Sequence, residues 1–220
     1  NPLASPDIIG VASGASAGAA AAVLLLGGGV ALTALWAFAG GFLAVLTALT
    51  LSALASRRNI ANLVLSGIVV NALAQSVLML MKLAADPEKE LASIEFWTMG
   101  SFADITLSKL LGALPWILLG LTGLFALRRQ IVLLGLEEDD ARMLGVPVKY
   151  MRPAILMLAT LVTGAVISVT GLIAFIGLLA PHIARLLTRS SRFSTTVLAG
   201  LCGGILLLLS DVLARSIGDS

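Results

Sequence analysis

Long apolar runs separated by short polar segments dominate the chain. A helix needs about 20 mostly apolar residues to cross the hydrocarbon core of a bilayer. Five stretches meet that length on their own, at about 8–28, 31–54, 60–84, 107–127 and 195–215. The pattern therefore predicts an all-α protein that crosses a membrane several times.

The apolar region 152–187 is too long for one span. A single helix of that length would measure about 54 Å, whereas the hydrocarbon core is about 30 Å thick. Thr170 and Gly171, near the middle of the region, offer a turn. We therefore expect two spans here and about seven transmembrane helices in all.

The positions of the basic residues support this topology, because cytoplasmic loops are enriched in lysine and arginine. With seven spans, ten basic residues fall on one face of the membrane and four on the other; a single span over 152–187 would give eight and six. The ten are Arg57, Arg58, Arg128, Arg129, Arg142, Lys149, Arg152, Arg185, Arg189 and Arg192. Their face is expected to be cytoplasmic, with residue 1 on the same side and residue 220 outside.

Two connecting segments are long enough to have structure of their own. The external segment 85–106 mixes five acidic residues with Trp97 and other apolar side chains, which predicts a short helix or loop at the membrane interface. The cytoplasmic segment 128–151 predicts a short amphipathic helix over 137–145, ended by Gly145 with Pro147 just beyond. This helix is either a surface for a soluble partner or a solvated connector.

Composition excludes several classes of function. The chain is 59% hydrophobic and 12% charged, whereas about a quarter of a soluble domain is charged, so soluble enzymes and nucleic-acid-binding proteins are excluded. The single cysteine, Cys202, allows no intrachain disulfide, and no metal site is suggested. His182 has no hydrolase motif around it and there is no phosphate-binding loop, so we expect neither enzyme activity nor a bound cofactor in this chain.

Polar residues in the third span are the first candidates for a functional role. Gly67, Asn71 and Gln75 recur every four residues and are expected to share one helix face, which Lys82 extends outward. Amides inside a membrane face protein or a water-filled cavity. The stripe is therefore either the lining of a transport pathway or a set of hydrogen bonds between helices.

A pair of opposite charges near the outer end of the last span is the second candidate. Asp211 and Arg215 are four residues apart, so they can pair on one helix face. Either the two charges neutralise each other, or Arg215 reaches a partner outside the membrane.

Four segments, taken in order along the chain, resemble the ABC-importer permeases for iron-siderophores, haem and cobalamin. They are 1–15 (NPLASPDIIG, then SGA), 141–145 (ARMLG), 175–185 (FIGLLAPHIAR) and 211–215 (DVLAR). Trp97, Gly100 and Ser101 also fit the pattern of the family's external helix. The combination covers essentially the whole chain.

The resemblance implies an architecture and a function. Family members have ten transmembrane helices, so residues 1–220 would form one permease domain that matches helices three to nine and is incomplete at both ends. Its role would be to import a metal chelate across a bacterial cytoplasmic (inner) membrane. The first expectation for this chelate is an iron-siderophore, and haem and cobalamin are the alternatives. The alternative is an ion-gradient-driven secondary transporter, which needs an intramembrane ionisable relay; here only Asp211 is available.

The resemblance also implies partners and residue roles. The partners would be a second permease subunit, identical or paralogous, an extracytoplasmic substrate-binding protein, and two cytoplasmic ATPases that hold ATP and magnesium.

The resemblance assigns roles to single residues as well. One cytoplasmic gate would include Asn1 and Leu3, and a second would include Asn59, Ile60 and Ala61. The third span matches the pathway helix, which favours that role for Gly67, Asn71 and Gln75. ATPase coupling would fall to Glu138, Ala141, Arg142 and Gly145, and docking of the binding protein to Arg215.

Overall fold

The computed structural model describes residues 9–55, 60–103, 105–136, 138–188 and 193–218. Every regular element in these ranges is a helix, in agreement with the predicted fold class. The chain divides into two compact units. The larger unit contains residues 6–127 and 147–173, and the smaller contains 1–5, 128–146 and 174–220.

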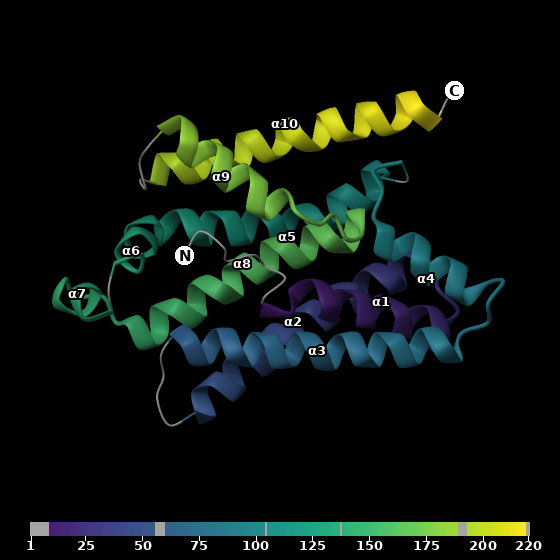
Figure 1. Cartoon of the computed structure of the whole chain (residues 1–220), viewed down its shortest axis with the longest axis horizontal. Coiled ribbons are helices and arrows are strands. Elements are labelled where there is room, and N and C mark those ends of the chain that lie inside the picture. The colour runs from purple at the N-terminus through teal and green to yellow at the C-terminus, as the bar shows by residue number, and fades with distance from the viewer. Residues whose placement is uncertain (1–8, 56–59, 104, 137, 189–192, 219–220) are drawn as a thin grey trace. The chain divides into compact units, whose positions relative to one another are not determined.

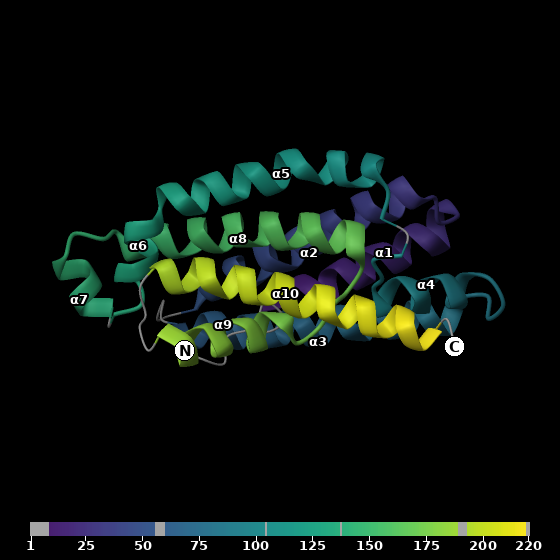
Figure 2. The ribbon, with the colours of Figure 1, turned by 90° about the horizontal axis from the view of Figure 1, so that it is seen from above.

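The larger unit is built around one buried helix. Its helices are α1 (Val11–Leu26), α2 (Val30–Leu54), α3 (Ile60–Ala84), α4 (Glu90–Met99), α5 (Leu107–Ala126) and α8 (Val148–Thr170). Most of α1 is buried, and α1 packs against α2, α3, α4 and α8. Helix α5 runs alongside α8, which in turn packs against α2 (Figures 1 and 2).

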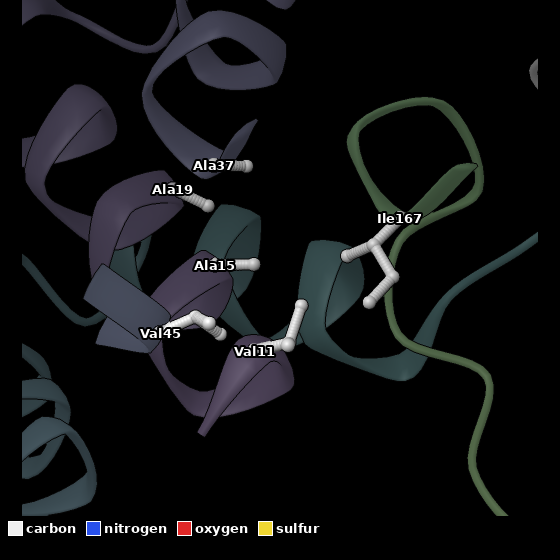
Figure 3. Close-up of a cluster of buried hydrophobic side chains, with 6 residues drawn as sticks. All are labelled: Val11, Ala15, Ala19, Ala37, Val45 and Ile167. Carbon is white, nitrogen blue, oxygen red and sulfur yellow. The ribbon is translucent and has the colours of Figure 1, made fainter. Parts of the chain in front are cut away.

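Small side chains allow α1 and α2 to lie in close contact. A Cβ atom added to Gly14 would lie 2.5 Å from the Cβ of Ala44 and 2.6 Å from the carbonyl oxygen of Gly40. The adjoining core contains Val11, Ala15, Ala19, Ala37, Val45 and Ile167, which come from α1, α2 and α8 (Figure 3). Within a membrane, helices associate through such close van der Waals packing, because lipid is as apolar as the side chains.

The smaller unit contains α6 (Arg128–Leu133), α7 (Glu138–Met143), α9 (Ile176–Thr188) and α10 (Phe193–Gly218). Helices α9 and α10 pack against each other. The hydroxyl oxygens of Thr188 and Thr195 lie 3.3 Å apart at this contact. A Cβ atom on Gly203 would lie 3.3 Å from that of Ala180, so the two helices approach closely at this position.

The predicted spans correspond to helices, although not all have full length. Five helices of the described chain are long and apolar enough to cross a membrane: α2, residues 61–84 of α3, α5, α8, and residues 194–216 of α10. Helices α1 and α9 are apolar but have only 16 and 13 residues, which corresponds to about 24 Å and 20 Å. Gly27, with φ +75, ends α1 earlier than its apolar pattern predicts.

The turn expected inside 152–187 is confirmed. Helix α8 ends at Thr170, and Gly171 takes φ +69. Phe175 has φ +68, a conformation that is costly for a residue with a side chain, and α9 begins at the next residue. Helix α8 starts at Val148, so the final four residues of the predicted segment 128–151 belong to this helix.

The two predicted connecting segments contain short helices. The segment 85–106 contains α4, as expected. The segment 128–151 contains α6 and α7, whereas the sequence predicted only one short helix there. The missed helix, α6, follows α5 directly after Leu127; it has only six residues and begins with Arg128 and Arg129, which the sequence analysis assigned to the cytoplasmic segment. Residue 137, the expected start of the predicted helix, lies outside the described residues.

Candidate functional site

The three polar-stripe residues of α3 do not share one environment. Gly67 is buried, Asn71 is half-buried and Gln75 is exposed. Each four-residue step advances about 40° around an α-helix, because a turn takes 3.6 residues. The stripe therefore runs obliquely along α3, from the core at Gly67 to the surface at Gln75, and its role in a transport pathway stays a prediction.

Asn71 lies at the edge of the contact between α1 and α3. A Cβ atom added to Gly10 would lie 3.4 Å from the backbone nitrogen of Asn71 and 3.5 Å from the Val70 side chain. Val70 and Leu78 are buried on α3. These residues attach α3 to the rest of the larger unit, so the exposed face that carries Gln75 points away from the core.

Lys82, at the end of the polar stripe, forms an ion pair with a residue of α4. Its Nζ lies 2.9 Å from Oε1 of Glu95 on α4, and the two side chains are 22% and 47% exposed. This ion pair connects the end of α3 to α4. Glu95 lies in the acidic segment 85–106, 13 residues after Lys82. Patterns of neighbouring residues do not predict an ion pair at that separation.

The middle of α4 and the segment after its last residue pack against the rest of the larger unit. Ile94 is only 1% exposed and packs in a cluster with Ala20, Val23, Leu78 and Ala85. Beyond the end of α4, the backbone N–H of Ser101 donates a 2.8 Å hydrogen bond to the carbonyl oxygen of Thr170, the last residue of α8. Helix α4 is thus connected to α1, α3 and α8.

The acidic-to-basic helix α7 forms as the sequence predicts. Arg142 donates to Glu138 at 2.6 Å, and another of its nitrogens lies 4.0 Å from Asp139. Acidic residues in the first turn and an arginine in the last both interact favourably with the helix dipole. The side chain of Arg142 remains 60% exposed, so it is accessible from outside the helix.

Backbone hydrogen bonds end α7 at the predicted glycine. Gly145 has φ +82. Its N–H donates to the carbonyl of Arg142 at 2.9 Å, and the N–H of Val146 donates to the carbonyl of Ala141 at 3.0 Å. A glycine with positive φ commonly ends a helix in this way. Within the predicted set, Ala141 is buried at 1% exposure, Glu138 is half-buried, and Arg142 and Gly145 are exposed.

The two predicted gates fall mostly on residues that are not described. Asn1, Leu3 and Asn59 lie outside the described residues. Ile60 is the first residue of α3, and Ala61, which follows it, is exposed. The gate assignments remain predictions.

The charge pair near the end of α10 forms as the spacing predicts. Nε of Arg215 donates to Oδ2 of Asp211 at 2.9 Å, and the side chains are 56% and 28% exposed. The pair neutralises charge locally and leaves much of the guanidinium surface accessible. Both expectations for Arg215, a local partner and an external one, are compatible with this geometry.

Comparisons with known proteins give a consistent result. The family model described as the FecCD transport family matches residues 1–220. The cobalamin import system permease protein BtuC of Halobacterium salinarum is 33% identical over 98% of this chain and 58% of its own length. The ferric enterobactin transport system permease protein FepG of Escherichia coli is 36% identical over 99% of this chain and 65% of its own length.

Another relative is named for a different substrate. The molybdate import system permease protein MolB of Haemophilus influenzae is 33% identical over 100% of this chain and 65% of its own length. A solved structure, described as an inward-facing conformation of a metal-chelate type ABC transporter, matches 100% of this chain and 71% of its own with a TM-score of 0.89 and 32% identity. The chain thus spans about three fifths to two thirds of these curated relatives.

Proposed function

The chain belongs to the FecCD transport family, and on this premise we propose that it is part of the permease subunit of an ATP-driven importer that moves a metal chelate into the cytoplasm. The observation that carries the proposal is the match of the family model over all 220 residues. The similarity to a metal-chelate type ABC transporter over the whole chain supports it. Hydrolysis of ATP would take place on separate ATPase subunits.

An iron-siderophore is our proposed cargo, with haem and cobalamin as members of the same chelate class. Relatives named for ferric enterobactin, cobalamin and hemin support the class, each at 33–36% identity. The molybdate relative has a similar identity, so the degree of similarity does not separate one cargo from another. We expect the substrate-binding protein to select the cargo before it reaches this subunit.

The transport pathway would run along the exposed face of α3, where a second permease subunit completes it. Gln75 is exposed and Asn71 is half-buried beside it, so both amides can offer hydrogen bonds to a polar cargo. Gly67 is buried and would serve helix packing. Movements near Asn1 and Leu3, and near Asn59, Ile60 and Ala61, would open and close the cytoplasmic end.

Coupling to the ATPases would use α7. Its exposed Arg142, paired with the half-buried Glu138, would contact a partner, and Ala141 and Gly145 would fix the shape of the helix and its end. The binding of ATP with magnesium would favour one of two states of the complex, and α7 would transmit the change to the permease. On the opposite side of the membrane, Arg215 would contact a carboxylate of the binding protein.

Reconstitution distinguishes this function from the alternative. The full-length permease is incorporated into liposomes with its ATPase and binding protein, and uptake of a radiolabelled ferric siderophore is measured. We expect uptake that requires ATP and persists when ionophores collapse the ion gradients. Uptake driven by an ion gradient without ATP would support the secondary transporter. The subunit stoichiometry of the reconstituted complex tests for a second permease subunit, and fractionation of native membranes tests the proposed location in the inner membrane.

A further inference from the structure

The connection between α8 and α9 takes a left-handed backbone conformation at both of its ends. Residues 171–175 form it, since α8 ends at Thr170 and α9 begins at Ile176. Gly171 has φ +69 and Phe175 has φ +68. Glycine adopts such values freely, whereas a residue with a side chain does so at a cost. Within the described ranges, Phe175 is the one residue other than glycine with positive φ.

Hydrogen bonds close a tight turn at Phe175. The N–H of Ile176 donates to the carbonyl oxygen of Ala174 at 2.9 Å, two residues back in the chain. A turn of this kind with a positive φ at its central residue is rare and strained. The N–H groups of Leu178 and Leu179 both donate to the carbonyl oxygen of Phe175 at 3.0 Å, so Phe175 holds the N-cap position of α9. Residues in that position usually have an extended backbone and a polar side chain, and Phe175 has neither.

The end of α8 before this turn is anchored to α4 within the larger unit. The N–H of Gly171 donates to the carbonyl oxygen of Ile167 at 2.9 Å, which closes the last turn of α8. The N–H of Ser101 donates to the carbonyl oxygen of Thr170 at 2.8 Å. A Cβ atom on Gly171 would lie 2.5 Å from the carbonyl oxygen of Trp97, so the backbones of the two segments are in direct contact.

The helix after the turn packs against α10 within the smaller unit. Ala180 and Ala184 of α9 are buried, at 4% and 0% exposure. A Cβ atom on Gly203 of α10 would lie 3.3 Å from the Cβ of Ala180, and the hydroxyl oxygens of Thr188 and Thr195 lie 3.3 Å apart. Because the contacts are repeated along α9, we expect α9 and α10 to move as one body.

A strained residue between an anchored segment and a packed helix pair has the properties of a hinge. Hinges in proteins are a few residues, often at the ends of helices, that absorb a change of φ and ψ. The left-handed conformation of Phe175 is unfavourable by itself, and the hydrogen bonds that Ala174 and Phe175 accept offset this cost. We therefore expect a second conformation, with negative φ at Phe175, to lie close in free energy and to be populated.

We propose that Phe175 is a hinge residue. Its backbone alternates between positive and negative φ, and α9 and α10 turn together about this residue relative to the anchored end of α8. The movement is a property of the chain itself. The inference therefore goes beyond the proposed function and holds for either kind of transporter, whatever the cargo.

Distances between spin labels in the full-length protein test the hinge. Cysteines replace Val166 of α8 and Leu179 of α9 in a Cys202→Ser background, and double electron–electron resonance is measured in nanodiscs with excess unlabelled protein. We expect two distance populations for this pair. A control pair at Ala92 of α4 and Val166 lies within the larger unit, with one label on each side of the anchor, and should give one population. No ATPase or cargo is present, so the result does not depend on transport.

Three substitutions of Phe175 separate the backbone from the side chain. Phe175→Gly removes the cost of positive φ and should change the ratio of the two populations about tenfold. Phe175→Val should change the ratio in the opposite direction, because a β-branched residue is strongly disfavoured at positive φ. Phe175→Leu is the matched control, since leucine is not branched at Cβ and has a similar cost at positive φ, and it should keep the wild-type ratio.

Three results would overturn the proposal. The first is a distance distribution that is the same in the wild-type protein and in the glycine and valine variants. The second is a change in Phe175→Leu as large as that in Phe175→Gly, because the side chain and not the backbone would then be responsible. The third is a control pair with two populations, since the movement would then lie within the larger unit. Opposite changes in the glycine and valine variants, with one population for the control pair, would support the hinge.

Discussion

Gly100 and Gly171 lie so close together that neither position has room for a side chain. A Cβ atom on Gly171 would lie 2.8 Å from the Cα of Gly100 and 2.5 Å from the carbonyl oxygen of Trp97. A Cβ atom on Gly100 would lie 2.5 Å from the carbonyl oxygen of Leu172. Both glycines have φ +69, a conformation that other residues rarely adopt. This contact attaches the end of α4 to the end of α8.

Replacing either glycine with alanine should destabilise the protein. Gly171→Ala places a methyl group against the backbone and strains the residue at positive φ, so we expect a loss of about 2 kcal/mol or more in the free energy of unfolding. The shift in thermal unfolding of the full-length protein in detergent measures it. Gly112→Ala, in open space within α5, is the matched control and should cause no loss. Equal stability of Gly171→Ala and the wild-type protein would contradict the steric interpretation.

The ion pair between Lys82 and Glu95 should show coupling between α3 and α4. The single reversals Lys82→Glu and Glu95→Lys place like charges together, and the double reversal restores an opposite pair. Because both side chains are partly exposed, we expect a coupling of about 0.5–1 kcal/mol in a double-mutant cycle of thermal unfolding. Strictly additive effects would show that the pair contributes nothing.

Charge reversal at Arg142 should weaken binding of the ATPase while membrane insertion stays intact. We expect about tenfold lower affinity, since loss of one partner from a charged interface contact commonly costs more than 1.4 kcal/mol. Co-purification of the ATPase with the full-length permease measures it. The double variant Glu138→Arg and Arg142→Glu retains an ion pair within α7, so it separates helix stability from docking. If the ATPase is retained at wild-type levels in the single variant, Arg142 has no coupling role.

Arg215→Glu should impair docking of the binding protein and leave basal ATPase activity unchanged. The reversed charge would repel a carboxylate on the partner, and we expect about tenfold weaker binding by surface plasmon resonance. Arg215→Lys keeps the positive charge and should lose less. Asp211→Asn removes the local partner of Arg215 and should not weaken docking. Unchanged affinity in Arg215→Glu would exclude this contact.

Exposure of Gln75 to the transport pathway can be measured by thiol labelling. In a full-length protein with Cys202→Ser, we expect a cysteine at position 75 to react with a membrane-impermeant maleimide in the presence of the second subunit, and saturating cargo to slow the reaction. A cysteine at position 78 should react much more slowly, because Leu78 is 6% exposed and packs in the core. Equal labelling at both positions, or labelling that cargo does not change, would remove Gln75 from the pathway.

Features that depend on neighbouring residues could be predicted from the sequence. Hydrophobic length located the spans, and Gly171 and Gly145 marked chain turns that the structure contains. The pairs Glu138–Arg142 and Asp211–Arg215 formed because residues four apart lie on one helix face. The motifs that resemble a permease family are also local, which is why they could be recognised before the structure.

Contacts between segments that are distant in the sequence could not be predicted from local patterns. The packing of α3 on α1 and α2 set which side of α3 is buried, so that Gly67 is buried and Gln75 is exposed. Lys82 met Glu95, and Gly100 met Gly171, because helix packing brought their segments together. Apolar length and local turns set where most of the helices form, whereas the contacts between helices depend on how whole helix surfaces fit together.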